Sequence, residues 1–232
     1  MLIKMKKLTY VVLVWNEVKT IRRAINDVKN IKFPNKEIIV IDNASTDGTK
    51  EILKTIKNVK IIYRKKNLGA GKSTITGIKK AKGEYVFIQF SDLEYDHFRS
   101  LDMMNYAVKN NLDIVFGSRL KNKRSILKLI YKKPSYLATI LTTFLINIFY
   151  KKKFTDIIGA KLYKKDSVKN IPSNSFHTGF DFEFISRACK RNLKIGEISI
   201  KYKPRINSKD KKIKFYHIFN ALYEIFKVKL FE

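Results

Sequence analysis

The stretch YVFIQFSDLEYD, residues 85–96, joins a continuous apolar run to three acidic residues at alternate positions, Asp92, Glu94 and Asp96. An unbroken apolar run of this length is typical of a strand buried on both faces of a parallel sheet. Alternate carboxylates that leave a strand project to one side. They can share a hard cation such as Mg²⁺ or Mn²⁺, whereas a solvated loop after a strand is the plainer interpretation.

Apolar runs and helical spacing alternate on both sides of this stretch. Runs at residues 8–14, 37–41, 59–63 and 113–116 have the composition of buried strands. After the first of them, apolar residues recur at helical spacing at Val18, Ile21, Ile25 and Val28, and a helix is also predicted to end near Gly83. Strands that alternate with helices form a parallel sheet with right-handed crossovers. We therefore predict an α/β fold with a mostly parallel sheet flanked by helices.

Polar residues follow three of the predicted strands at their carboxyl ends. They are Glu17 with Asn16, then Asp42, and finally Asp92 with Glu94. In sheets of this kind, ligands bind outside the carboxyl ends of the strands. We therefore expect these residues to meet along one edge of the sheet and to form a binding site there.

Positive charge dominates the composition, with 49 Lys and Arg against 20 Asp and Glu and a net charge of +29 over 232 residues. Such a charge suits nucleic acid, an anionic membrane surface or phosphorylated substrates, or it reflects a bias toward lysine codons. The lysines are spread along the chain, and no helix-turn-helix, zinc-finger or ribonucleoprotein signature accompanies them, so nucleic acid is not expected as a partner.

The lone Cys189 excludes an internal disulfide, and the first residues lack the apolar core of a signal peptide. A reducing, cytoplasmic location is therefore expected. Gly71-Lys72-Ser73-Thr74 looks like the end of a phosphate-binding P-loop, but Lys66 stands where that motif needs a glycine. We interpret this run as a helix start that can still offer amides to an anion.

Several motifs, in order and over nearly the whole chain, resemble family 2 glycosyltransferases, and within them the dolichol-phosphate mannose synthase group. They are residues 11–17 (VVLVWNE), 38–49 (IIVIDNASTDGT), 89–96 (QFSDLEYD), 117–119 (GSR), 155–156 (TD), 180–183 (FDFE), 195–202 (IGEISIKY), and Tyr202-Lys203-Pro204-Arg205 with Lys211-Lys212-Ile213. The resemblance implies one GT-A domain over residues 1–213, with a nucleotide-sugar half at about 1–120 and an acceptor half at about 121–213. Residues 214–232 are predicted to form a C-terminal amphipathic helix.

The resemblance implies an inverting transferase that takes a sugar from a UDP- or GDP-linked donor. By the same resemblance, Leu13, Trp15 and Glu17 line the base pocket, and Asp42 hydrogen-bonds the base or ribose. A flat apolar wall and an acceptor for a ring N–H are what a base requires. A core position for Trp15 is the alternative. The full set of implied donor-binding residues is Leu13, Trp15, Glu17, Asp42, Ser91, Asp92, Arg119, Arg205 and Lys211.

The family motif for the metal is Asp-x-Asp with a further oxygen ligand two residues later. Here Phe90 takes the place of the first Asp, which leaves Asp92 and Glu94 as the implied ligands of Mg²⁺ or Mn²⁺. The cation neutralises the departing diphosphate, and basic side chains clamp its oxygens. Because Phe90 cannot bind a metal, a non-catalytic relative that binds nucleotide or membrane is an alternative function.

The resemblance implies a polyprenyl phosphate, or a lipid-linked or cell-envelope saccharide, as the acceptor. Asp156 matches the acid before the acceptor segment of the family. Asp156 and Asp92 are the two residues that we expect to be catalytic. Asp156 could serve as general base for a sugar hydroxyl of a soluble acceptor, which is a further alternative, whereas a phosphate acceptor needs no strong base. Asp181 and Glu183 either orient the acceptor side or favour a helix N-terminus. His177 is interpreted as a surface residue or as one that lies just behind the site.

Two segments suit a membrane surface. Residues 137–150 are largely apolar with lysines on both flanks, but they are too short for a confident spanning helix. Residues 215–231 are aromatic and basic, as in an interfacial helix. We expect peripheral binding to the anionic inner face of the cytoplasmic membrane, and core packing of both segments is the alternative.

Overall fold

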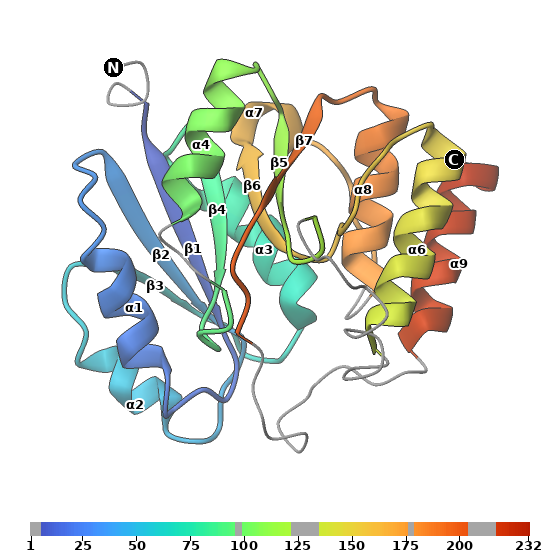
Figure 1. The fold of residues 1–232 in the computed structure, drawn as a ribbon. Coiled ribbons are helices and arrows are strands. Elements are labelled where there is room, and N and C mark those ends of the chain that lie inside the picture. The colour runs from blue at the N-terminus through green and yellow to red at the C-terminus, as the bar shows by residue number, and fades with distance from the viewer. Residues whose placement is uncertain (1–5, 96–98, 122–134, 176–178, 204–216) are drawn as a thin grey trace.

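The computed structural model of the chain describes residues 6–95, 99–121, 135–175, 179–203 and 217–232 (Figure 1). Within them lies one seven-stranded sheet, in the order β3-β2-β1-β4-β6-β5-β7. The strands are β1 (Leu8–Val14), β2 (Lys36–Asp42), β3 (Lys60–Tyr63), β4 (Tyr85–Phe90), β5 (Ile114–Ser118), β6 (Ala160–Lys164) and β7 (Ile195–Ser199).

All pairings in the sheet are parallel except those of β6, which runs antiparallel between β4 and β5. The predicted α/β class with a mostly parallel sheet is confirmed. β1 is fully buried along its length, as the apolar run predicted, because strands lie on both sides of it and helices cover both faces of the sheet. The expected strands at residues 59–63 and 113–116 are present with bounds shifted by one or two residues.

Helices cover both faces of the sheet (Figure 1). On one face, α1 (Ile21–Lys29), α2 (Thr49–Lys54) and α4 (Arg99–Lys109) contribute apolar side chains to one core cluster. On the other, α3 (Gly69–Lys80) and α8 (Phe180–Lys190) pack over the sheet through residues such as Ile78 and Phe184. The short α7 (Lys165–Val168) follows β6.

Two further helices, α6 (Ser135–Tyr150) and α9 (His217–Phe231), lie side by side beyond α8 (Figure 1). The ring of Phe149 in α6 meets that of Phe226 in α9 edge-on, with centroids 5.3 Å apart. None of the helices in the described part of the chain has the length and apolar content of a bilayer-spanning segment.

Local expectations were met unevenly. Val18 was predicted to be the first apolar residue of the helix, but it lies before α1. The carbonyl of Glu17 accepts the amides of Thr20 and Ile21, which forms a turn ahead of the helix. The third helix ends at Lys80, before Gly83. The run of residues 71–74 lies inside α3, where Lys72 Nζ donates to the carbonyl of Ser173. The division of the chain at residues 213 and 214 stays a prediction.

Candidate active site

The carboxyl ends of β2, β1 and β4 are neighbours along one edge of the sheet. Val14 pairs with Asp42 on one side, and Leu13 pairs with Phe90 on the other. The Leu13 carbonyl also accepts both the amide (3.2 Å) and the hydroxyl (2.8 Å) of Ser91. The polar residues that follow these strands therefore start from adjacent points, as the sequence predicted.

The loops that follow β1 and β2 are bonded to each other. The amide of Asn16 donates to Ser45 Oγ (2.9 Å), and the amide of Thr46 donates to Asn16 Oδ1 (2.8 Å). Asp47 accepts the amides of Val18 and Thr49 and the hydroxyl of Thr49. Partial burial alone would raise the pKa of Asp47, but these hydrogen bonds outweigh it and lower the pKa.

Among the described residues, the loops after β1, β2 and β4 each contain one non-glycine residue in the left-handed region, namely Asn16 (φ 53°), Ala44 (φ 63°) and Leu93 (φ 61°). Asparagine tolerates this conformation, whereas for alanine and leucine it costs about 1–2 kcal/mol. Strained backbone of this kind concentrates at functional sites, where the surrounding structure maintains it. The bonded loops supply that support here.

Asp42 is a buried carboxylate with one unused oxygen. Its Oδ1 accepts the amide of Ser45 (3.2 Å), whereas Oδ2 has no partner among the described residues. Buried polar atoms are nearly always paired, so an orphaned acceptor suggests a ligand donor. Trp15 beside it is 37% exposed, which excludes the core position considered for it, and Tyr63, paired with Asp42 in the sheet, is 43% exposed. Tyr63 was not predicted.

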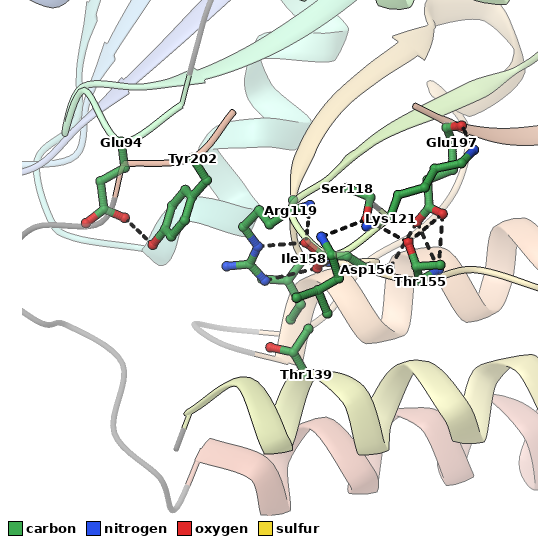
Figure 2. A network of polar contacts seen from close by, with 12 residues as sticks. Glu94, Ser118, Arg119, Lys121, Thr139, Thr155, Asp156, Ile158, Glu197 and Tyr202 are labelled. Atoms are coloured by element: carbon green, nitrogen blue, oxygen red, sulfur yellow. Dashed lines mark hydrogen bonds and ion pairs between the residues drawn. The ribbon is translucent and has the colours of Figure 1, made fainter. Parts of the chain in front are cut away.

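The acidic loop after β4 places Asp92 and Glu94 at intermediate exposure. Asp92 Oδ1 accepts the amide of Glu94 (3.2 Å), which closes a tight turn at Leu93. The Glu94 side chain accepts a hydrogen bond at Oε2 from the hydroxyl of Tyr202, at 2.6 Å (Figure 2). Tyr202, which the sequence placed only in a motif, thus contacts an implied metal ligand.

Arg119 and Asp156 form a buried ion pair (Figure 2). Nε and Nη2 of Arg119 donate to the two carboxylate oxygens of Asp156 at 2.7 and 2.9 Å, and the amides of Arg119 and Ile158 add two further bonds. Asp156 is 0% exposed and the Arg119 side chain 10%. Burial would raise the pKa of Asp156, but the guanidinium and the N–H donors outweigh it and lower the pKa.

Glu197 in β7 holds the chain segment that carries Asp156. Its carboxylate accepts the amides of Thr155 and Asp156 and the hydroxyl of Thr155, and Thr155 in turn bonds Ser118 at 2.6 Å (Figure 2). A Cβ on Gly159 would lie 1.9 Å from the Gly117 carbonyl, so only glycine permits this approach. The antiparallel β6 brings these residues to the edge, because its amino end lies beside the carboxyl end of β5.

Two aromatic rings flank the guanidinium of Arg119. The ring centroids of Tyr136 and Tyr202 each lie 5.3 Å from its Cζ. Cation–π contact of this kind holds the flat guanidinium while leaving its edge for hydrogen bonds. Asp156 accepts the Nε proton and one Nη2 proton, so the two protons of Nη1 and the second proton of Nη2 are not used by this ion pair.

The residues implied for a divalent cation are compatible with it in number and chemistry. Mg²⁺ is held in many sites by one or two carboxylates together with substrate phosphates and water, and Asp92 and Glu94 supply two. Within the described ranges, no group of three or more His, Cys, Asp or Glu side chains is placed to hold a metal. Among the described residues, Asp92 and Glu94 would therefore share a bound cation with diphosphate oxygens and water, and Asp96 of the same acidic run lies outside the described ranges.

The remaining predicted residues differ in where they lie. Arg205, Lys211 and His177 lie outside the described residues. Asp181 pairs with the buried Lys161 at 3.2 Å. Glu183 is buried and bonds Arg187 and the residue 173–175 loop, so its contacts are structural.

Known proteins resemble this chain in sequence. The family model described as Glycosyl transferase family 2 matches residues 9–172. The chain is 27% identical over 218 residues to the UDP-N-acetylglucosamine–dolichyl-phosphate N-acetylglucosaminyltransferase of Methanococcus voltae, covering 84% of this chain and 85% of that protein. It is 32% identical over 176 residues to the poly(ribitol-phosphate) β-N-acetylglucosaminyltransferase TarP of Staphylococcus aureus strain N315, covering 71% of this chain and 52% of TarP. The chain thus spans about half the length of TarP.

The likeness extends to solved structures. Glucosyl-3-phosphoglycerate synthase of Mycobacterium tuberculosis, solved with Mn²⁺, UDP and phosphoglyceric acid, matches with a TM-score of 0.73 at 14% identity, over 99% of this chain and 81% of that one. The same enzyme was solved with Mg²⁺ and UDP. This likeness confirms the predicted GT-A arrangement of the sheet.

Proposed function

The chain belongs to glycosyl transferase family 2, and from that membership we propose that it is an inverting enzyme that moves a sugar from a nucleoside diphosphate to a polyprenyl phosphate. The observation that carries the proposal is the convergence of Trp15, Asp42, Asp92 and Arg119 on one edge of the sheet. We propose UDP rather than GDP as the nucleotide, because UDP stands in the names of a relative and of a structural neighbour.

The donor is proposed to lie across the ends of β2, β1 and β4. Trp15 offers an exposed ring as a wall for the base, and Oδ2 of Asp42, which has no partner among the described residues, accepts a base or ribose donor. Leu13, Glu17 and Ser91 are proposed as the other donor-binding residues of this edge. The carbonyl of Leu13 accepts the hydroxyl of Ser91. Arg205 and Lys211 remain proposed phosphate ligands.

Asp92 and Glu94 are the residues proposed to hold Mg²⁺ or Mn²⁺ against the diphosphate. A divalent cation neutralises the charge that develops on the leaving phosphate. Arg119 supports the same charge through the N–H donors that the ion pair leaves over, while Asp156 keeps its guanidinium in one orientation. Asp92 therefore acts on the donor side, through binding rather than proton transfer.

The geometry of Asp156 favours a phosphate acceptor. A general base must be able to take up a proton, but Asp156 is fully buried, accepts four N–H donors and has a lowered pKa. A phosphate acceptor is already an anion and needs no such base. Transfer to the hydroxyl of a soluble sugar, with Asp156 as base, is therefore the less supported alternative.

Two stripes of exposed apolar side chains support a membrane location for the acceptor. Each stripe follows helical spacing along one of the two neighbouring helices α6 and α9. In α6 the residues are Leu137, Leu141, Phe144 and Ile148, and in α9 they are Phe219, Tyr223, Phe226 and Leu230. Contiguous exposed apolar surface is typical of an interaction site.

We propose that the exposed apolar residues of α6 and α9 contact an anionic bilayer. The net charge of +29 opposes close association of two copies but attracts anionic lipid. Lys227 and Lys229 are interleaved with the apolar stripe of α9. Tyr136, in the first turn of α6, contacts Arg119, so the proposed membrane-binding helix reaches the candidate active site. A lipid phosphate at the bilayer surface would therefore lie near Arg119.

Sugar transfer can be tested directly. The full chain is incubated with radiolabelled UDP- and GDP-sugars, Mn²⁺ or EDTA, and two acceptors, a short polyprenyl phosphate in detergent and a free sugar. Labelled lipid is extracted, and label on the free sugar is counted in the aqueous phase. Lipid labelled only with Mn²⁺ is expected, and Asp92→Asn should abolish it, while Asp102→Asn, an exposed carboxylate of α4, should not. Donor binding without turnover would instead favour the non-catalytic alternative based on Phe90, and label on a soluble sugar alone would refute the lipid acceptor.

Vesicle co-sedimentation tests the membrane face. The chain should sediment with vesicles that contain anionic lipid and less with neutral ones, and Phe144→Ser should reduce binding. Tyr63→Ser is the matched control, because it removes an aromatic side chain that is 43% exposed, against 57% for Phe144, at the donor edge. Equal binding by both variants would refute the assignment of this face to the bilayer.

A further inference from the structure

A row of mutually tilted aromatic rings runs from the end of β4 to Arg119. Phe90, which stands in place of a motif carboxylate, lies 6.3 Å from Tyr95 between ring centroids. Tyr95 lies 5.2 Å from Tyr202, and the Tyr202 ring lies 5.3 Å from the guanidinium carbon of Arg119. The residue that departs from the family motif is thus the first member of a continuous set of contacts.

Tyr202 is attached to the acidic loop at three points. Its hydroxyl donates to Glu94 Oε2 at 2.6 Å (Figure 2). Tyr95 and Tyr202 form an antiparallel bridge, and the amide of Lys203, the next residue, donates to the Glu94 carbonyl at 2.9 Å. Both the backbone and the carboxylate of Glu94 are therefore held by the segment that follows β7.

We propose that Tyr202 is a positioning residue, which fixes the Glu94 carboxylate for the divalent cation at a site that lacks the first motif aspartate. The inference rests on the proposed function, because it assumes that Glu94 is a metal ligand. It goes further because it assigns the orientation of the Glu94 carboxylate to Tyr202 and to the row of aromatic rings.

The physical reason is the freedom of the glutamate side chain. A free carboxylate on a flexible chain must lose rotamer freedom when it binds a cation, and this loss weakens binding. An O–H···O⁻ bond of 2.6 Å is in the short, charge-assisted range and restrains one oxygen before the cation arrives. Outer contacts of this type change metal affinity by about 10–100-fold when they are removed.

Tyr202→Phe isolates the hydroxyl, since the ring and its contacts with Tyr95 and Arg119 are kept. Free Mn²⁺ is measured by electron paramagnetic resonance as the full chain is titrated in the presence of UDP, which reports binding without turnover. The Kd for Mn²⁺ should rise by about tenfold or more. UDP affinity without metal and the Tm without metal should stay near those of the wild type.

Tyr136→Phe is the matched control. It removes a phenol whose ring lies at the same 5.3 Å from Arg119 and on which Glu94 acts electrostatically, whereas the Tyr202 hydroxyl donates a hydrogen bond to Glu94. Its Kd for Mn²⁺ should match the wild type.

The outcomes separate the inference from the function on which it rests. An unchanged or lower Kd for Mn²⁺ in Tyr202→Phe would overturn the positioning role while leaving the metal site intact, and a lower value would mean that the hydroxyl competes with the cation. An equal rise in both variants would also overturn it, because the effect would then follow from the surroundings of Arg119. If the wild-type chain with UDP binds no Mn²⁺, the proposed metal site itself is refuted, and the inference with it.

Discussion

Replacement of Asp156 by Asn should destabilise the protein strongly. Asp156 is 0% exposed and pairs with an Arg119 side chain that is 10% exposed, so the variant leaves a guanidinium buried without a counter-charge. Asn keeps one acceptor oxygen, but its NH₂ group faces the N–H donors of Arg119. Breaking a buried pair by removing one partner costs about 3–5 kcal/mol of unfolding free energy. At about 2–4 °C per kcal/mol for a chain of this size, the Tm should fall by about 6–20 °C.

The assay is thermal and urea unfolding followed by circular dichroism, repeated across pH. Because the pKa of Asp156 is lowered in the folded state, its contribution to stability is fully present above the unfolded value of about 3.9. That contribution is lost as the pH falls through the folded pKa. The difference in Tm between wild type and variant should therefore be constant from about pH 5 to 8 and shrink below about pH 3.9.

Asp166→Asn is the matched control. Asp166 pairs with Lys169 at the same 2.7 Å, but both side chains are exposed, so no measurable change is expected. If Asp156→Asn and Asp166→Asn were equally stable, burial would not be what makes the first pair matter. A double replacement of Arg119 by Met and Asp156 by Leu should cost less than either single change, because no unpaired charge remains.

Three further predictions follow from single residues. Asp42→Asn should weaken UDP binding by about tenfold in calorimetry while the Tm stays the same or rises, since Oδ2 has no partner in the described structure; an unchanged affinity would exclude Asp42 from the donor site. Gly159→Ala should lower the unfolding free energy by about 1–3 kcal/mol, because its Cβ would meet the Gly117 carbonyl at 1.9 Å; unchanged urea unfolding would contradict this close approach. Burial raises the pKa of the Cys189 thiol to about 12, so a disulfide reagent at pH 8 should label it only as fast as the protein unfolds, and rapid labelling of the folded chain would show that it is accessible.

Much of the fold could be predicted because the sheet is parallel and buried. Strands such as β1 and β4 appear in the sequence as unbroken apolar runs, and a run of that kind needs no knowledge of its partners. The antiparallel β6 and the helix α4 were not predicted. β6 is short and contains Lys161, whose buried ammonium pairs with Asp181 from a distant helix, so its composition does not resemble a buried strand.

The candidate site was predictable to the same extent. Polar residues at the ends of neighbouring strands had to meet, since parallel strands share one carboxyl edge. Asp42 needed only that rule, whereas Trp15 was expected at the site through the resemblance to the family. The contacts of Tyr202 with Glu94, and of Glu197 with Asp156, join residues 108 and 41 positions apart. No spacing in the sequence signals such a pair.

By itself, the sequence determined the order of buried strands and the edge at which their polar ends collect, because hydrophobic patterning acts locally along each element. Only the tertiary structure decided what those polar groups do to one another. Whether Asp156 is a free base or one half of a buried ion pair depends on the distance to Arg119 and on the exclusion of water. Both are properties of packing, and they change the pKa of a carboxylate without changing a single residue.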